Sequence, residues 1–163
     1  MAVVSKSRAS AALAALATSG LTVATAVAVP PPPNSSFSGQ TNQTKASDHG
    51  VTLATDANGH VSTMSLGWRA KCRKKGIFWT ANTQVNGGSN GLAQNGDVFS
   101  DNGGYTGHAG RGITGIITVA LHGQFTDSDH ANGIWKAKVT VKKKGKTIDK
   151  CKTPAIKWSV ARR

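Results

Sequence analysis

The chain has 163 residues, 20 lysines and arginines, and only seven acidic residues, so its formal net charge is +13. This length allows one domain with a core of its own and excludes a second domain of ordinary size. All seven acids are aspartate, and Gly, Thr, Val, Asn, Ser and Lys are abundant, so the composition favours strands and turns over helices.

The N-terminal segment, residues 1–28, has the pattern of a secretory signal peptide. A start with Lys6 and Arg8 precedes a stretch made almost entirely of Ala, Leu, Val, Ser and Thr, which ends in the small-x-small sequence before residue 29. We expect cleavage after Ala28, no transmembrane segment in the mature chain, and a secreted or extracellular protein that is released or associated with the cell surface. The alternative is an uncleaved anchor over residues 9–29, but Ser, Thr and Gly dilute its apolar run.

Residues 29–36 form a proline-rich spacer, because consecutive prolines enter neither a helix nor a strand ladder. A single β domain is then expected over residues 37–163. Within it, apolar residues alternate with a period of two, which indicates half-buried antiparallel strands. The alternating segments are 64–72, 77–85, 113–125, 135–142 and 156–160, and turn sequences occur at 56–59, 75–76, 129–133 and 144–145.

These strands predict an all-β fold, an antiparallel β-sandwich of about seven to nine short strands, with a closed up-and-down β-barrel as the alternative. Residues 86–112 differ from the rest, because they are rich in glycine and have only Val98, Phe99 and Tyr105 as apolar anchors. This composition predicts a long mobile loop that contains a loose hairpin.

Cys72 and Cys151 are the two cysteines of the chain. Export would take them into an oxidising compartment, where an even number of cysteines usually pairs, so we expect a disulfide between them. Closing so long a loop contributes about 4 to 5 kcal/mol in the chain-entropy model. The alternative is two free, buried thiols.

The four tryptophans fall on the apolar faces of the predicted strands, which favours core packing over a sugar-binding platform. They are Trp68, Trp79, Trp135 and Trp158. Tyr105 in the glycine-rich segment and Phe78, which is out of phase with its strand, are better placed to contact a ligand.

Candidate catalytic groups are sparse. Asp48, Asp56, Asp127 and Asp129 lie in predicted turns, where aspartate forms local hydrogen bonds. The five histidines lack the close spacing of a zinc motif, and neither a Gly-x-Ser-x-Gly elbow nor a phosphate-binding loop is present. We therefore expect no catalytic residue, no metal and no cofactor. The alternative is a small secreted hydrolase that uses loop residues such as Asp101, His108 and His122.

Three sequence features carry a family resemblance: the opening Phe37-Ser38-Gly39-Gln40-Thr41, the strand end Trp68-x-x-x-Cys72, and the closing Cys151-x-x-Pro-x-x-x-Trp158. With the glycine-rich middle, this order resembles a loose group of uncharacterised secreted single-disulfide β domains of Gram-positive bacteria. The resemblance covers residues 37–163. It implies a β fold and export, and it carries over no functional residues.

Positive charge is the strongest functional signal, and it is concentrated in two segments that each adjoin a cysteine. A disulfide between the cysteines would bring the two segments together on one solvent face. The residues expected to bind a polyanion are Arg69, Lys71, Arg73, Lys74, Lys75, Lys136, Lys138, Lys142, Lys143 and Lys144, and Lys146, Lys150 and Lys152 continue the second segment.

We therefore expect a secreted non-catalytic domain that binds an anionic cell-envelope polymer or polysaccharide through multivalent, salt-sensitive contacts. Nucleic acid is disfavoured, because the basic segments lack interleaved aromatic side chains. One alternative reading is that the lysines only solubilise the strands and protect sheet edges. Another is a structural or partner-binding module that uses the glycine-rich segment as its contact.

Overall fold

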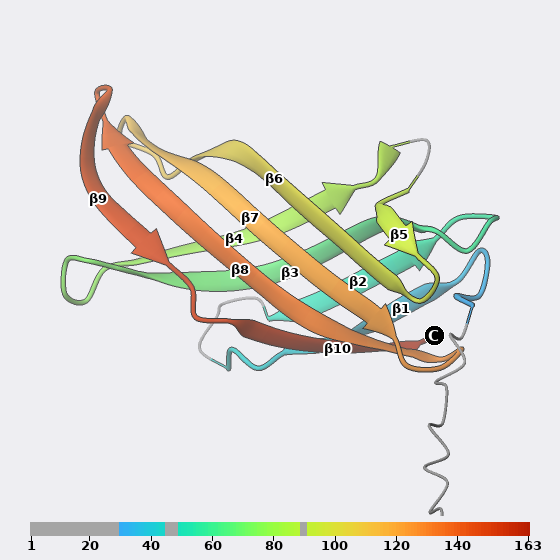
Figure 1. The fold of residues 1–163 in the computed structure, drawn as a ribbon. Coiled ribbons are helices and arrows are strands. Elements are labelled where there is room, and N and C mark those ends of the chain that lie inside the picture. Colours follow the sequence, from blue (N-terminus) through green and yellow to red (C-terminus); the bar gives the residue numbers. More distant parts are fainter. Residues whose placement is uncertain (1–29, 45–48, 89–90) are drawn as a thin grey trace, which may run out of the picture.

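The computed structural model describes residues 30–44, 49–88 and 91–163 and shows an all-β protein with antiparallel pairing throughout (Figure 1). The prediction of an all-β antiparallel fold is confirmed. The strands are β1 (Ser36–Thr41), β2 (Gly50–Thr55), β3 (Val61–Cys72), β4 (Phe78–Asn86), β5 (Ala93–Asn95), β6 (Val98–His108), β7 (Ile113–Phe125), β8 (His130–Lys143), β9 (Lys146–Lys152) and β10 (Ile156–Arg162). In the described part of the chain, no helix is long and apolar enough to cross a membrane.

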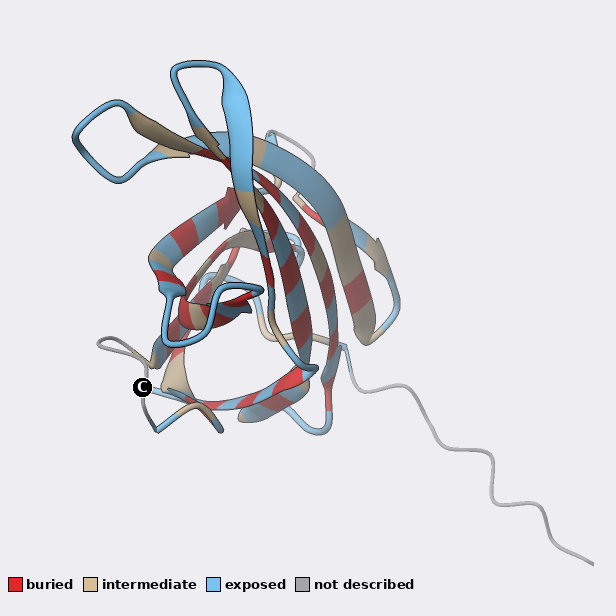
Figure 2. Cartoon of the chain, turned by 90° about the vertical axis from the view of Figure 1, so that its left-hand side faces the viewer, coloured by how far each residue is buried: buried red, intermediate tan, exposed pale blue. Residues whose placement is uncertain are grey.

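The ten strands of the described residues belong to one hydrogen-bonded sheet that curls around a hydrophobic core (Figures 1 and 2). Strands β3 and β4 face β6 and β7 across this core. The arrangement is roughly consistent with either predicted architecture, because one antiparallel sheet curls around the core and still leaves free edges on β4, β5 and β6.

Strand β8 holds two neighbours in succession along one of its edges. Because β7 pairs with β8 over nearly its whole length, β9 and β10 must both use the opposite edge. Strand β3 repeats this arrangement, with β4 along one edge and β2 followed by β9 along the other. Strands β3 and β8 are therefore connected twice, through β9 at one end and through β2, β1 and β10 at the other.

A side-chain amide fills a gap that this topology leaves beside β3. The pairing of β3 with β2 ends at Leu66, and its pairing with β9 begins at Lys71. Between them, the N–H of Arg69 donates to Oε1 of Gln43 (2.8 Å), and Nε2 of Gln43 donates to the carbonyl of Arg69 (2.9 Å). The side-chain amide of Gln43 therefore forms the same two hydrogen bonds with β3 that the backbone of a neighbouring strand would form.

Side chains bridge the free edge of β4 and the part of the β6 edge that β5 leaves unpaired. Within the described residues, no backbone hydrogen bond joins β4 to β6. The buried Thr83 of β4 forms the bridge. Its hydroxyl accepts a hydrogen bond from Nε1 of Trp68 (2.7 Å) and shares one with the hydroxyl of Tyr105 on β6 (2.5 Å). Tyr105 thus has a structural contact, and the prediction that it is available to a ligand is not supported.

All four tryptophans lie in the core, as their strand faces predicted. Trp79 and Trp158 fit there because pairs of glycines face their rings. A Cβ at Gly115 would lie 2.6 Å from the Trp79 ring, and one at its cross-strand partner Gly107 would lie 3.2 Å from it. Another paired couple, Gly123 and Gly133, lies under Trp158 in the same way, at 2.8 and 2.6 Å.

The prediction of a long mobile loop over residues 86–112 is wrong. This segment contains β5 and the 11-residue strand β6, which pairs with β7 over its whole length. The predicted hairpin is present as the β5–β6 pair. The strand pattern is hidden because Asp101, Gly103 and Gly107 occupy positions of β6 that pair with inward positions of β7, so no apolar alternation appears. Of the β6 glycines, Gly107 is the one that faces the Trp79 ring. One turn is also displaced: β8 already begins at His130, inside the segment predicted to be a turn.

The disulfide between Cys72 and Cys151 is confirmed. It lies in the short ladder between β3 and β9, which has two register pairs, Lys71 with Lys152 and Cys72 with Cys151. The covalent bond therefore reinforces the junction with the fewest hydrogen-bonded residues. An intramolecular disulfide is compatible with an extracellular protein.

The predicted signal peptide, residues 1–28, lies outside the described residues. The proline-rich segment that follows is attached to the β2–β3 turn. The hydroxyl of Thr55 donates to the carbonyl of Pro32 (2.6 Å), the N–H of Ser35 donates to that hydroxyl (3.0 Å), and the N–H of Asn34 donates to the carbonyl of Asp56 (2.9 Å).

Candidate functional site

A row of three lysines crosses the outer face of the sheet beside the disulfide. Lys71 on β3 is the register partner of Lys152 on β9, which is in turn the register partner of Lys138 on β8. Register partners project from the same face, and adjacent strands lie about 4.8 Å apart. All three side chains are exposed, whereas the next row, Cys72, Cys151 and Val139, is buried. The disulfide thus brings the two basic segments together, as the sequence predicted.

This lysine row is not a device that protects sheet edges. Strands β3, β8 and β9 are paired at the positions of the row, whereas the free edges belong to β4, β5 and β6. Those three strands contain no lysine or arginine. Like charges directly opposite one another destabilise a sheet. The position of the row is therefore not explained by edge protection.

No described carboxylate neutralises the row. Ion pairs between described residues join His130 to Asp127 and Arg162 to Asp129, both away from these lysines. The acid nearest in sequence is Asp149, and its carboxylate is occupied by backbone N–H groups. These belong to Lys150 (2.7 Å), Arg73 (3.2 Å) and Lys74 (3.4 Å). The row is a set of positive charges with no acidic counterpart in the described structure.

A surface groove of about 720 Å³ runs along the row, and we call it the basic groove. Basic side chains line it together with the disulfide and the connection between β9 and β10. Its lining residues are Lys71, Cys72, Arg73, Lys138, Val139, Thr140, Lys150, Cys151, Lys152, Thr153 and Pro154. No aromatic side chain lines it, so it offers charge contacts and no stacking surface.

The structure brings some of the predicted binding residues together and separates others. Lys71, Arg73 and Lys138 line the basic groove, and Lys136 lies two residues from Lys138 on the same face of β8. Arg69 lies on β3, where its guanidinium carbon is 3.6 Å from the centre of the Phe78 ring. The others follow the strand ends: Lys74 and Lys75 lie in the β3–β4 turn, Lys142 and Lys143 end β8, and Lys144 lies in the β8–β9 turn.

Lys150 and Lys152 belong to the groove although they were not among the predicted binding residues. They flank Cys151, just as Lys71 and Arg73 flank Cys72. In a strand, the two neighbours of a buried cysteine point to the opposite, solvent-facing side. The sequence signal that could have identified Lys150 and Lys152 is therefore the presence of a basic residue on both sides of each cysteine.

The alternative catalytic residues do not form a site. Asp101 is the register partner of the buried Leu121, whereas His122 is that of Ser100, so Asp101 and His122 project from opposite faces of the sheet. His108 pairs with Thr114 at the far end of the same ladder. Among the described residues, no three His, Cys or Asp side chains are grouped so that they could hold a metal ion.

The aspartates of the predicted turns are engaged in local contacts. Asp56 accepts hydrogen bonds from the N–H groups of Asn58 (2.8 Å) and His60 (2.9 Å). The N–H of Asp129 and the imidazole of His130 keep the pKa of Asp127 below its ordinary value. A carboxylate with a lowered pKa stays charged and forms hydrogen bonds within the turn. A general acid needs the opposite, a raised pKa. Asp48 lies outside the described residues.

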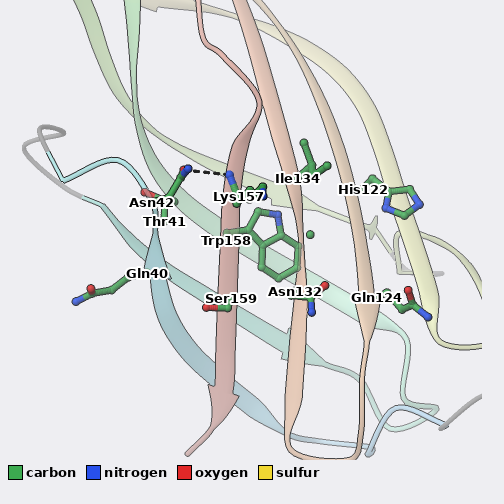
Figure 3. Close-up of a pocket in the computed structure, with 11 residues that line it drawn as sticks. Gln40, Thr41, Asn42, His122, Gln124, Asn132, Ile134, Lys157, Trp158 and Ser159 are labelled. Carbon is green, nitrogen blue, oxygen red and sulfur yellow. Dashed lines mark hydrogen bonds between the residues drawn. The ribbon is translucent and has the colours of Figure 1, made fainter.

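A second, polar groove of about 640 Å³ lies over β10, β8 and β7 (Figure 3). Side-chain amides and His122 line it, together with Lys157 and the exposed Ile134. One of the amides is already used, because the N–H of Lys157 donates to Oδ1 of Asn42 (3.1 Å). The groove contains no carboxylate and a single histidine, so it offers no acid and base pair for hydrolysis.

Comparisons of this chain with protein-family models, with curated proteins and with solved structures produced no match. The resemblance to secreted domains of Gram-positive bacteria therefore stays a prediction. The functional argument depends on the geometry of the chain itself, and the basic groove is its most distinctive surface.

Proposed function

We propose that this protein is a non-catalytic binding module whose basic groove holds a linear anionic polymer. The observation that carries the proposal is the row of Lys71, Lys152 and Lys138, which places like charges side by side with no described carboxylate between them. This arrangement is unfavourable in the free protein, and an anionic chain lying along the groove relieves the repulsion.

The chemistry of the groove favours charge contacts over stacking. Lysine is a compact point charge that pairs with phosphate and carboxylate alike, and here the lysines are arranged in a line. Because the groove lacks aromatic side chains, single-stranded nucleic acid is a poorer fit than a polymer of sugar and phosphate or of uronic acids. The N-terminal pattern predicts export, and the disulfide is compatible with it. An exported protein would meet such polymers in the cell envelope.

Retention on purified bacterial cell wall tests this proposal. The groove variant Lys71→Gln/Lys138→Gln is compared with wild type and with Lys157→Gln/Arg163→Gln, which loses the same charge outside the groove. Wild type and the control should be retained at low ionic strength and released at high ionic strength, because exposed charge contacts are screened by salt. The groove variant should bind about tenfold more weakly at low salt. Equal retention of the three proteins, or retention that salt does not change, would contradict the proposal.

A further inference from the structure

One end of the molecule carries an unusual group of exposed apolar side chains. The turns that connect β3 to β4, β6 to β7 and β8 to β9 lie at this end, at the left of Figure 1 and toward the viewer in Figure 2. Ile77, Phe78 and Ile148 are exposed by 48%, 44% and 37%, and all three line one depression of about 210 Å³. We call this surface the apolar end.

The depression continues inward to the core. Its other apolar lining residues are Cys72, Trp79, Ala109, Ile113 and Val141, most of which are buried or half-buried. The turn residue Ile77 and the first residue of β4, Phe78, come from one side. Ile148 comes from the other, at a register shift in β9 where it has no partner on β8. Different elements therefore contribute to a single apolar surface, which exceeds the isolated exposed residues found on most proteins.

Positive charges occupy the same turns. Lys74 lines the depression, and Lys75 follows it in the β3–β4 turn. Arg111 lies in the β6–β7 turn, and Lys143, Lys144 and Lys146 lie at the β8–β9 turn. Asp149 also lines the depression and contributes one negative charge, and its carboxylate accepts hydrogen bonds from backbone N–H groups. Six basic residues against this one carboxylate leave the apolar end surrounded by an excess of positive charge among the described residues.

We propose that the apolar end docks onto an anionic lipid bilayer. Ile77, Phe78 and Ile148 enter the headgroup region, and the lysines of the surrounding turns contact lipid phosphates. Apolar side chains beside Lys and Arg are the chemistry of interfacial membrane binding, in which buried apolar area and attraction to anionic lipid act together.

The shape and charge of this surface favour a bilayer over the other occupants. The exposed apolar side chains come from the β3–β4 turn, the start of β4 and strand β9, around a shallow depression of about 210 Å³, so they suit a broad surface better than a small enclosed ligand. The positive rim would repel the same rim on a second copy of this chain. A polar polymer would gain nothing from Ile77 or Ile148. This inference concerns a different surface from the basic groove and does not depend on the proposed function.

Vesicle flotation of the full chain tests the inference. Wild type is compared with Ile77→Ser/Phe78→Ser/Ile148→Ser, the apolar-end variant. The matched control is Ile116→Ser/Ile134→Ser, whose side chains are exposed by 43% and 40% on the outer faces of β7 and β8. Vesicles contain either phosphatidylcholine alone or phosphatidylcholine with phosphatidylglycerol. Any contribution of residues 1–28 is common to all three proteins.

We expect wild type and the control to bind the anionic vesicles and to bind neutral vesicles weakly, and the apolar-end variant to lose about tenfold in affinity. Its melting temperature should fall only slightly, because the replaced side chains are partly exposed and the variant also loses the contact between Phe78 and Arg69. Equal binding of all three proteins to anionic vesicles would overturn the inference, since only charge would then matter. Binding of wild type to neither vesicle would also overturn it. Cell-wall retention of the apolar-end variant reports on the basic groove separately.

Discussion

At the scale of single residues, glycine decides how the aromatic core is packed. The paired glycines Gly107 and Gly115 leave room for Trp79, and Gly123 and Gly133 leave room for Trp158. In a sequence, these positions look like turn or loop residues, because an inward-facing glycine contributes no apolar side chain to the alternation. Inward-facing glycines allow tight packing of the core, and for the same reason they removed the apolar alternation that would have predicted strand β6.

A glycine substitution tests this packing. Gly123→Ala places a Cβ 2.3 Å from the Phe99 ring and 2.8 Å from Trp158, so it should destabilise the protein by about 1 to 3 kcal/mol, as overpacking does. Gly103→Ala is the matched control, because its Cβ would meet only the Asp101 carboxylate at 3.3 Å. Urea unfolding measures both. Equal stability of the two variants would show that glycine is not required at position 123 for the packing of Phe99 and Trp158.

At the scale of elements, the β3–β9 junction depends on the disulfide. The pairing of Cys72 and Cys151 was predictable from an even cysteine count together with an N-terminal pattern that predicts export. Their placement as register partners was not, because a strand sequence does not reveal which edge its neighbours share. Alternation predicted β3, β4, β7, β8 and β10, in which enough of the inward residues are apolar side chains for the period of two to be visible. It could not predict that Gln43 takes the place of a strand beside Arg69.

Removal of the disulfide measures what it contributes to this junction. Cys72→Ala/Cys151→Ala should lower the free energy of unfolding by about 4 kcal/mol, because the crosslink restricts the unfolded chain across a separation of 79 residues. The double variant is preferable to either single one, which would leave a free thiol. Chemical denaturation under oxidising and reducing conditions gives the comparison. A double variant as stable as wild type would show that the two-pair ladder needs no crosslink.

At the scale of the whole molecule, charge and apolar surface are distributed over different regions. The basic groove runs along the outer face of β3, β9 and β8, and the apolar end lies at the end of the molecule that carries the β3–β4, β6–β7 and β8–β9 turns (Figure 1). The sequence predicted that the two basic segments meet, because each adjoins a cysteine. It did not reveal the groove, whose walls depend on the β9–β10 connection, nor the apolar end, whose exposed apolar residues come from the β3–β4 turn, the start of β4 and strand β9.

The central claim is that the lysine row of the basic groove binds a linear polyanion, and titration with soluble polyphosphate tests it most directly. Affinities are measured at several salt concentrations for wild type, Lys71→Gln/Lys138→Gln and Lys157→Gln/Arg163→Gln. We predict that wild type and the control bind with affinities that fall steeply as salt rises, and that the groove variant binds about tenfold more weakly at low salt with a shallower dependence. Its melting temperature without ligand should be unchanged or slightly higher, because like charges have been removed from one row. Equal affinity and equal salt dependence in all three proteins would contradict the claim.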